Sequence, residues 1–412
     1  MSKIDELLRG VDVEWRPLGE VAEYVRGLTY NKSNESDDNS GFKVLRANNI
    51  TLSTNAINFD EIKYVKTDTK VKESQRLYKN DILISAASGS REHVGKVAFI
   101  FSDLDYYFGG FMAVIRCSQK IIPRFLFHFL ASGRFQKYLD EMLNSSTINN
   151  LSSSIMNSFL IPIPPLPVQN EIVRILDKFT ELTAELTAEL KAELTARKKQ
   201  YEYYREQLLS FEEGEVEWKT LGEVGEFQRG KRFVKDDIVS TGVPCIHYGE
   251  MYTYYGNWAY KTKSFLSKEL VESKKLRFAE MGDVIIVAAG ETIEDIGRGT
   301  AWLGNEDVIF HDACFSYRSP INPKYVSYFT RTKQFHDQIK KYISSGKISA
   351  INAKGLEKVI IPIPPPETQE RIVSILDKFD TLTNSLSEGL PKEIELRKKQ
   401  YEYYRDKLLT FS

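Results

Sequence analysis

Side chains able to do catalysis occur in this sequence, but not at the spacings that catalysis requires. The five histidines, at positions 93, 128, 247, 311 and 336, show no metal-ligand spacing. The sequence has no Gly-x-x-x-x-Gly-Lys-Ser/Thr loop, no Gly-x-Gly-x-x-Gly, no His-Glu-x-x-His and no Asn/Asp-Pro-Pro-Tyr/Phe motif of adenine methylases. The nuclease-like Glu217-Trp218-Lys219 has a twin in Glu14-Trp15-Arg16 and fits an entry strand better. We therefore predict a non-catalytic protein with no metal site.

Composition narrows the class of protein. A chain of 412 residues, 42% hydrophobic, is expected to fold into two or more domains. Its three cysteines lie far apart, which argues against disulfides and structural zinc and favours the cytoplasm. We expect no signal peptide and no membrane partner, because the apolar stretches are too short. With a net charge of −1, any nucleic acid must be held by local clusters or with help from partner subunits.

The elements that position the polar side chains form a duplication of roughly 200 residues. Four islands of sequence return at nearly the same offset: Val13–Val21 as Val216–Val224, Ile161–Pro165 as Ile361–Pro365, Ile175–Phe179 as Ile375–Phe379, and Arg197–Arg205, unchanged, as Arg397–Arg405. Between these islands the halves share only a skeleton, such as Asp81 with Asp283 and Gly95 with Gly297. Two copies of one frame therefore carry two unlike inserts.

The predicted fold class is α+β, in four segments. Residues 1–160 and 212–360 are expected to be mixed α/β domains, with short strands bounded by Gly, Ser, Asn and Asp. Each should contain one helix, Pro123–Leu143 and Pro323–Ile343, with proline in the first turn. Residues 161–211 and 361–412 are expected to be long helices.

Apolar residues recur every three or four positions along the helical segments, from Ile172 to Leu194 in the first copy. Two such stripes in one chain are predicted to pack as an antiparallel coiled coil, although two separate surface helices remain an alternative. The first helix contains a Thr-Ala-Glu-Leu repeat, whose unit adds about 6 Å and about 40° of rotation. The second has Gly389 and Pro391 there and should kink or break.

These motifs resemble specificity subunits of type I restriction–modification systems, with a spacer similar to the type IC subgroup. The resemblance covers the whole chain and is carried by Ile-Pro-Ile-Pro-Pro, Ile-Leu-Asp-Lys-Phe, the Thr-Ala-Glu-Leu repeat and Arg-Lys-Lys-Gln-Tyr-Glu-Tyr-Tyr-Arg. It implies that each variable domain is a target-recognition domain for one half of a bipartite, asymmetric site in double-stranded DNA. It also implies a complex with two methylase subunits and two motor-nuclease subunits. S-adenosylmethionine, ATP and Mg²⁺ would belong to those partners, with no cofactor in this chain.

Four loops at equivalent places in the two copies are the candidates for DNA contact. Arg and Lys suit guanine in the major groove and Asn suits adenine, although a phosphate contact or a solvated loop residue is the commoner role. The candidates in the first copy are Arg26, Lys32, Arg46, Asn48, Asn49, Ser88, Ser90, Arg91, Lys96, Asn149 and Asn150. Those in the second copy are Arg229, Lys231, Arg232, His247, Tyr248, Glu291, Thr292, Arg298, Ser345, Lys347 and Ser349.

The repeated Arg-Lys-Lys-Gln-Tyr-Glu-Tyr-Tyr-Arg segment is interpreted as a partner-docking site, because Tyr and Arg are enriched at interfaces. Helix packing and phosphate binding are the alternatives. The docking candidates are Tyr201, Tyr204, Arg205, Tyr401, Tyr404 and Arg405. For the whole chain, the competing hypotheses are a coiled-coil scaffold that binds only proteins and a DNA enzyme with a diverged site.

Overall fold

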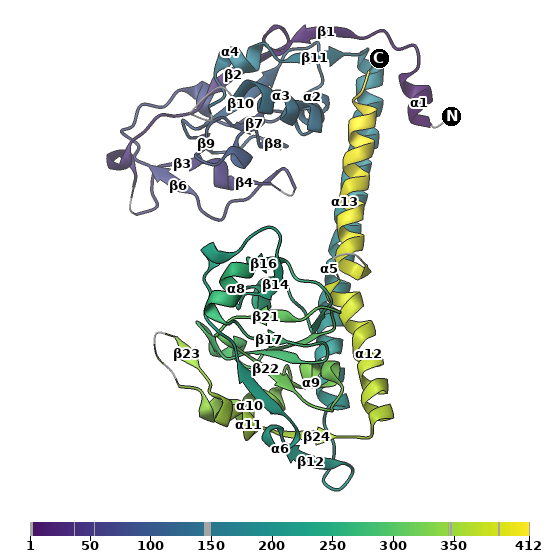
Figure 1. Ribbon diagram of the computed structural model, residues 1–412. Coiled ribbons are helices and arrows are strands. Elements are labelled where there is room, and N and C mark those ends of the chain that lie inside the picture. Colours follow the sequence, from purple (N-terminus) through teal and green to yellow (C-terminus); the bar gives the residue numbers. More distant parts are fainter. Residues whose placement is uncertain are drawn as a thin grey trace. The chain divides into compact units, whose positions relative to one another are not determined.

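The chain folds into two compact units, described here from a computed structural model covering residues 3–36, 38–52, 54–143, 150–344, 346, 348–385 and 388–411. Unit 1 comprises Met1–Glu189 with Ile394–Ser412, and unit 2 comprises Leu190–Glu393. Each unit contains one variable domain and parts of both helical segments (Figure 1). The α+β class predicted from the sequence is confirmed.

The variable domain of unit 1 is built around an antiparallel sheet in the order β2-β10-β7-β8. Its strands are β2 (Ala22–Arg26), β10 (Met112–Cys117), β7 (Ile82–Ser85) and β8 (Val97–Phe99). A smaller sheet joins β6 (Lys63–Val65), β3 (Phe42–Leu45) and β9 (Tyr107–Phe108), and β4 (Ile50–Thr51) pairs with β5 (Ala56–Ile57). This unit also contains α1 (Lys3–Leu8), α4 (Ser153–Asn157), and β1 (Glu14–Pro17), which pairs with β11 (Leu160–Ile163).

Unit 2 repeats this plan with additional strands. Its main sheet has the order β13-β22-β18-β20-β15, from Glu226–Arg229, Cys314–Arg318, Val284–Val287, Gly299–Trp302 and Trp258–Ala259. A second sheet joins β16 (Ser264–Leu266), β14 (Val243–Ile246), β21 (Val308–Phe310) and β17 (Phe278–Ala279). β12 (Glu217–Thr220) pairs with β24 (Ile360–Ile363), and β19 (Ala289–Gly290) with β23 (Ser349–Ala350). Short helices are α6 (Leu221–Val224), α7 (Glu250–Thr253), α8 (Lys268–Lys274) and α11 (Ala353–Glu357).

The aspartate shared by the two copies closes the turn before the central strand. Asp81 accepts a hydrogen bond from the backbone N–H of Tyr78. It also forms an ion pair with Arg116, in which Nε lies 2.9 Å from Oδ1. Asp283 does the same with Glu280 N–H and Arg318. Both carboxylates are buried. A buried charge is tolerated only when it is paired in this way, which explains why the pair belongs to the frame.

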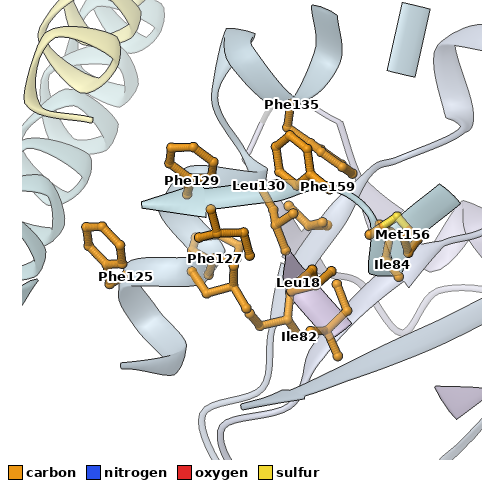
Figure 2. Close-up of a cluster of buried hydrophobic side chains, with 14 of the residues drawn as sticks. Leu18, Ile82, Ile84, Phe125, Phe127, Phe129, Leu130, Phe135, Met156 and Phe159 are labelled. Atoms are coloured by element: carbon orange, nitrogen blue, oxygen red, sulfur yellow. The ribbon is translucent and has the colours of Figure 1, made fainter. Parts of the chain in front are cut away.

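The helix predicted after each main sheet is interrupted, which corrects the expectation of one helix per copy. In unit 1 it forms α2 (Pro123–Leu130) and α3 (Gly133–Leu143), and in unit 2 α9 (Pro323–Phe329) and α10 (Lys333–Ile339). A hydroxyl side chain stands at each break: Ser132 and Thr332 donate to the carbonyls three residues earlier. Such local bonds compete with the helix and favour a new start. Phenylalanines of α2 and Phe135 of α3 belong to the same core as Ile82 and Ile84 of the sheet (Figure 2).

The predicted long helices are present. α5 runs without interruption over Leu166–Leu208, whereas the second copy is divided into α12 (Pro366–Asn384) and α13 (Gly389–Leu408), which confirms the predicted break. In unit 1, α5 and α13 run antiparallel, because Phe179 contacts Tyr404 while Thr180 contacts Tyr401. Unit 2 repeats the antiparallel arrangement between α12 and α5, where Phe379 contacts Tyr204 while Asp380 contacts Tyr201. Among the described residues, no helix combines the length and apolar content needed to cross a membrane.

Candidate nucleic-acid interface

A glycine fixes the start of the first polar loop in both units. A Cβ on Gly27 would lie 2.1 Å from the carbonyl oxygen of Gly109, and one on Gly230 would lie 2.2 Å from that of His311. Only glycine allows the backbone to approach so closely. The loop that follows is thereby held against the same strand end in each unit, so Gly109 and His311 occupy equivalent places.

In unit 1, three of the predicted loops line one cavity of about 910 Å³. Its lining includes the candidates Lys32, Arg46, Asn48 and Ser88, together with Tyr30 and Phe111. Lys32 and Asn48 are exposed, and Arg46 is half-buried. Glu61 holds two of these groups, accepting from Asn48 at 3.0 Å and facing the Arg46 guanidinium at 3.7 Å. The cavity thus presents cationic and amide donors beside aromatic rings.

The fourth loop is attached to the third in both units. Residue Asn150 forms a bridge to Ala87, and Arg26 donates to the Asn150 side chain at 3.2 Å and to the carbonyl oxygens of Leu151 and Gly110. In unit 2 the same place is filled by the strand pair β19 and β23. The four loops therefore meet at one end of each variable domain. Candidates Asn149, Ser345 and Lys347 lie outside the described residues.

Several candidates of unit 1 are used inside the domain. Asn49 is fully buried, with its amide accepting from Arg46 N–H and donating to the Asn58 carbonyl. Lys96 is buried, which lowers the pKa of its amine. Arg91 pairs with Asp140 of α3 at 2.6 Å, and Ser90 is exposed. We therefore withdraw Asn49 and Lys96 as DNA-contacting candidates.

The basic candidates of unit 2 differ in how freely they can reach a ligand. Arg229 donates from Nε to the carbonyl oxygen of Asp312 at 3.0 Å, and Lys231 donates to that of Lys274 at 3.4 Å. Arg232 is exposed. Glu291 and Thr292 are also exposed, whereas Arg298 pairs with Asp295 and Ser349 is buried in β23.

At the place equivalent to the cavity of unit 1, unit 2 has a cluster of aromatic and histidine rings. The rings of His247, Tyr248 and His311 lie 4.6–4.9 Å apart, with Phe233 against both histidines. Each histidine accepts a backbone N–H at Nδ1, from Gly249 and from Ala313, and Nδ1 of His311 also lies 3.1 Å from a carboxylate oxygen of Asp312. Burial lowers the pKa of both histidines, so they stay neutral near pH 7. The two domains therefore present unlike chemistry from one frame.

Sequence reasoning did not include two residues of these surfaces. Phe111 projects from the cavity with 73% of its surface exposed, and His311 completes the ring cluster. The Gly109-Gly110 pair before Phe111 was the available signal, since paired glycines mark a tight turn that presents the next side chain. No comparable local signal marked His311.

The docking candidates on the helices divide by exposure. Tyr201 is 6% exposed, and Arg205 and Arg405 stack over Tyr201 and Tyr401 within their own helices. Tyr204 and Tyr404 contact Phe379 and Phe179 across the helix pairs. The neighbouring Tyr203 and Tyr403, which were not candidates, are 61% and 62% exposed. No group of three or more His, Cys, Asp or Glu placed to hold a metal occurs in the part of the chain described.

Comparison with known proteins matches both halves of the chain to one family model. Residues 10–196 and 213–396 match the type I restriction modification DNA specificity domain. A putative type I restriction enzyme specificity subunit of Haemophilus influenzae is 34% identical over 99% of this chain and 98% of its own length. The EcoR124I/EcoR124II specificity subunit of Escherichia coli is 33% identical over 100% of this chain and 97% of its own. A solved chain from a study of assembly of the type I R-M system shares the fold, with a TM-score of 0.72, 19% identity and 98% coverage of both chains.

Proposed function

This chain belongs to the type I restriction–modification DNA specificity family, and on that basis we propose that it reads a bipartite, asymmetric DNA site. As a specificity subunit it is the non-catalytic, DNA-recognising component of such a system. In the proposal, the loops of unit 1 read one half-site and those of unit 2 read the other. The supporting observation is that equivalent loops converge on one frame in both units, yet carry unlike side chains.

The proposed partners are two adenine-N6 methylase subunits and two motor-nuclease subunits. Duplicated elements in one chain can bind two identical partners equivalently. The exposed Tyr203 and Tyr403, on the repeated helical motif, are the proposed docking points, because exposed aromatic rings are favoured at interface centres. S-adenosylmethionine, ATP and Mg²⁺ are assigned to the partners. The three free cysteines fit action in the cytoplasm.

Co-expression of the chain with its methylase partner, followed by mapping of N6-methyladenine across a genome, tests the proposal. The expected result is methylation of one two-part motif with a fixed gap. Exchanging residues 1–158 for the equivalent domain of a relative should change one half of that motif only. A complex that binds DNA without sequence preference would instead favour a protein-binding scaffold, and methylation by the pure chain would favour an enzyme.

Docking is tested separately. Tyr203→Ala with Tyr403→Ala should weaken co-purification of the methylase subunit without lowering the melting temperature of the chain. Tyr201→Ala is the matched contrast, since its ring is buried and its loss should lower the melting temperature. Unchanged methylase binding by the Tyr203/Tyr403 double variant would contradict the assignment.

A further inference from the structure

The repeated helices hold their variable domains through the same two side chains in both units. Gln169 accepts from the backbone N–H of Ile122 at 2.9 Å and donates to the Pro164 carbonyl. Gln369 accepts from that of Asn322 at 2.9 Å and donates to the Pro364 carbonyl. In both units, the donor is the backbone N–H of the residue just before the proline that begins α2 or α9. This contact is independent of the side chains of the variable domain.

The second contact is a carboxylate that receives two donors from the variable domain. In unit 1, Arg124 and His128 lie 2.8 Å from Asp177. In unit 2, Lys324 and Tyr328 lie 2.7 Å from Asp377. Each cation also lies over an aromatic ring, as Lys324 does over Trp258 at 3.9 Å. The helical residues are the same in both units, while the donors differ.

One turn further along, the helices differ. We name Gln169, Asp177 and Thr180 the first seat, and Gln369, Asp377 and Asp380 the second seat. Thr180 shares a hydrogen bond with Tyr401 at 2.9 Å. Asp380, at the equivalent position, accepts from Asn257 of the second variable domain at 2.7 Å. Thus the second seat has a charged contact to its own domain at the position where the first has a neutral hydroxyl.

The variable domains differ in a way that matches this difference between the helices. Arg331 lies between α9 and α10, just before Thr332, and its guanidinium donates to the carbonyl oxygens of Gly256 and Gly299. Its positive charge favours the ionised form of Asp380, whose pKa is raised by burial. At the equivalent position, just before Ser132, the first domain has Ala131. The second unit therefore combines the Asp380 carboxylate with Arg331 and Asn257, whereas the first combines the Thr180 hydroxyl with Ala131. Each combination is self-consistent.

We propose that position 180/380 is a key that decides which recognition domain each seat accepts. The Gln and Asp contacts fit either domain, so the seats are otherwise interchangeable. Placing the first domain on the second seat would leave Asp380 beside Ala131, without Asn257 or Arg331. Placing the second domain on the first seat would leave Arg331 without the carboxylate whose ionised form it favours. Removing the charge that compensates a partly buried ionised group is costly, because the remaining charge stays desolvated.

The proposal rests on the proposed function, in that each domain reads its own half-site. The test is a chain that carries residues 216–358 in place of 13–158, so that the second domain occupies both seats. Co-expressed with the methylase, it is expected to methylate an inverted repeat of the second half-site. The Thr180→Asp variant of this chimera should raise methylation of that repeat about tenfold and raise the melting temperature.

The same substitution has the opposite expected effect in the native chain. Thr180→Asp there should lower the melting temperature and reduce methylation that depends on the first half-site. A general structural role of position 180 cannot produce opposite signs in the two chains. Equal methylation and melting temperature of the chimera with Thr180 and with Thr180→Asp would overturn the proposal. Failure of the native chain to methylate a two-part motif would instead overturn the proposed function.

A double-mutant cycle in the native chain covers the case in which no chimera folds. Asp380→Thr and Asn257→Ala should each lower the melting temperature, and the double variant should lose less than the sum. Thr383→Ser, on the same helix, is the control, and its effect on the melting temperature should simply add to that of Asn257→Ala. Additive losses for Asp380→Thr and Asn257→Ala would count against the key.

Discussion

At the scale of single residues, the proposed role of the unit 1 cavity in DNA recognition can be tested by substituting its basic side chains. Arg46→Ala should weaken specific binding by about 1–3 kcal/mol and relax the first half-site, if its guanidinium contacts a guanine edge. The measurement is binding of the methylase complex to a motif-containing duplex and to duplexes altered in one half. Lys137→Ala, on the exposed side of α3, is the control for loss of one positive charge. Equal losses on matched and altered duplexes would identify Arg46 as a phosphate contact.

A buried histidine makes unit 1 sensitive to acid. Burial lowers the pKa of His128 despite the bond to Asp177, with Arg124 and Arg405 adding to the effect. The unfolded chain, with an ordinary pKa near 6.5, therefore binds the proton more readily than the folded chain. Stability should be full above pH 6.5 and should decline as the pH falls from there through the lowered pKa.

The histidine's counterpart in unit 2 supplies the control for this prediction. His128→Tyr places the residue found at 328 opposite Asp177 and keeps a donor to the carboxylate. The fall in melting temperature between pH 6.5 and 5 should become shallower in this variant. Because His247, His311 and His336 also have lowered pKa values, part of the slope should remain. An unchanged slope would show that His128 does not contribute.

Residue type predicted the cavity only in part. The duplication identified the loops that hold Lys32, Arg46 and Asn48, and these three residues line one cavity. Asn49, next in sequence, turns inward and accepts from the backbone N–H of Arg46, which precedes the short helix Ala47–Asn49. That choice depends on the local backbone, since Asn satisfies a turn as readily as it binds a base. The ring cluster of unit 2 joins residues from three distant segments, which a single sequence does not reveal.

At the scale of elements, the break between α12 and α13 depends on Gly389. Its φ is 77°, and a Cβ there would lie 2.5 Å from the Thr381 carbonyl oxygen. Gly389→Ala should therefore lower the free energy of unfolding by more than the roughly 1–2 kcal/mol expected for left-handed backbone alone. Gly282→Ala isolates that backbone cost, because its φ is 97° and nothing lies within 4 Å of the added atom. Chemical denaturation of both variants gives the comparison, and equal losses would contradict a steric contribution.

The long helices and their break were predictable because they depend on local pattern. Leucine spacing, the Thr-Ala-Glu-Leu repeat and the Gly-Pro pair act within a few residues. The interruption after Leu130 was not predicted, because Ser132 stands in a sequence with continuous helical periodicity. Pairing of β1 with β11 joins residues nearly 150 positions apart. Such long-range pairing has no signal in local spacing, although the repeated islands mark both of its strands.

At the scale of the whole molecule, α5 is proposed to set the gap between the half-sites. Deleting Thr187–Leu190 removes about 6 Å of helix, equivalent to about one to two base pairs. The methylated motif should then have a shorter gap and unchanged half-sites, as read by genome-wide methylation mapping. A length-preserving variant, Thr187→Ala with Glu189→Ala, should leave the gap as it was. An unchanged gap in the deletion would contradict the ruler role.

The way the chain crosses between its units has a consequence for biosynthesis. Unit 2 is one continuous stretch, Leu190–Glu393, whereas unit 1 needs Ile394–Ser412 as well as the beginning of the chain. Leu408, Leu409 and Phe411 lie in the same core as Ile82 and Phe125. During synthesis on the ribosome, unit 1 can therefore be completed only after unit 2 has been translated, and a truncation that removed Leu408–Phe411 would damage the core of unit 1 rather than that of unit 2.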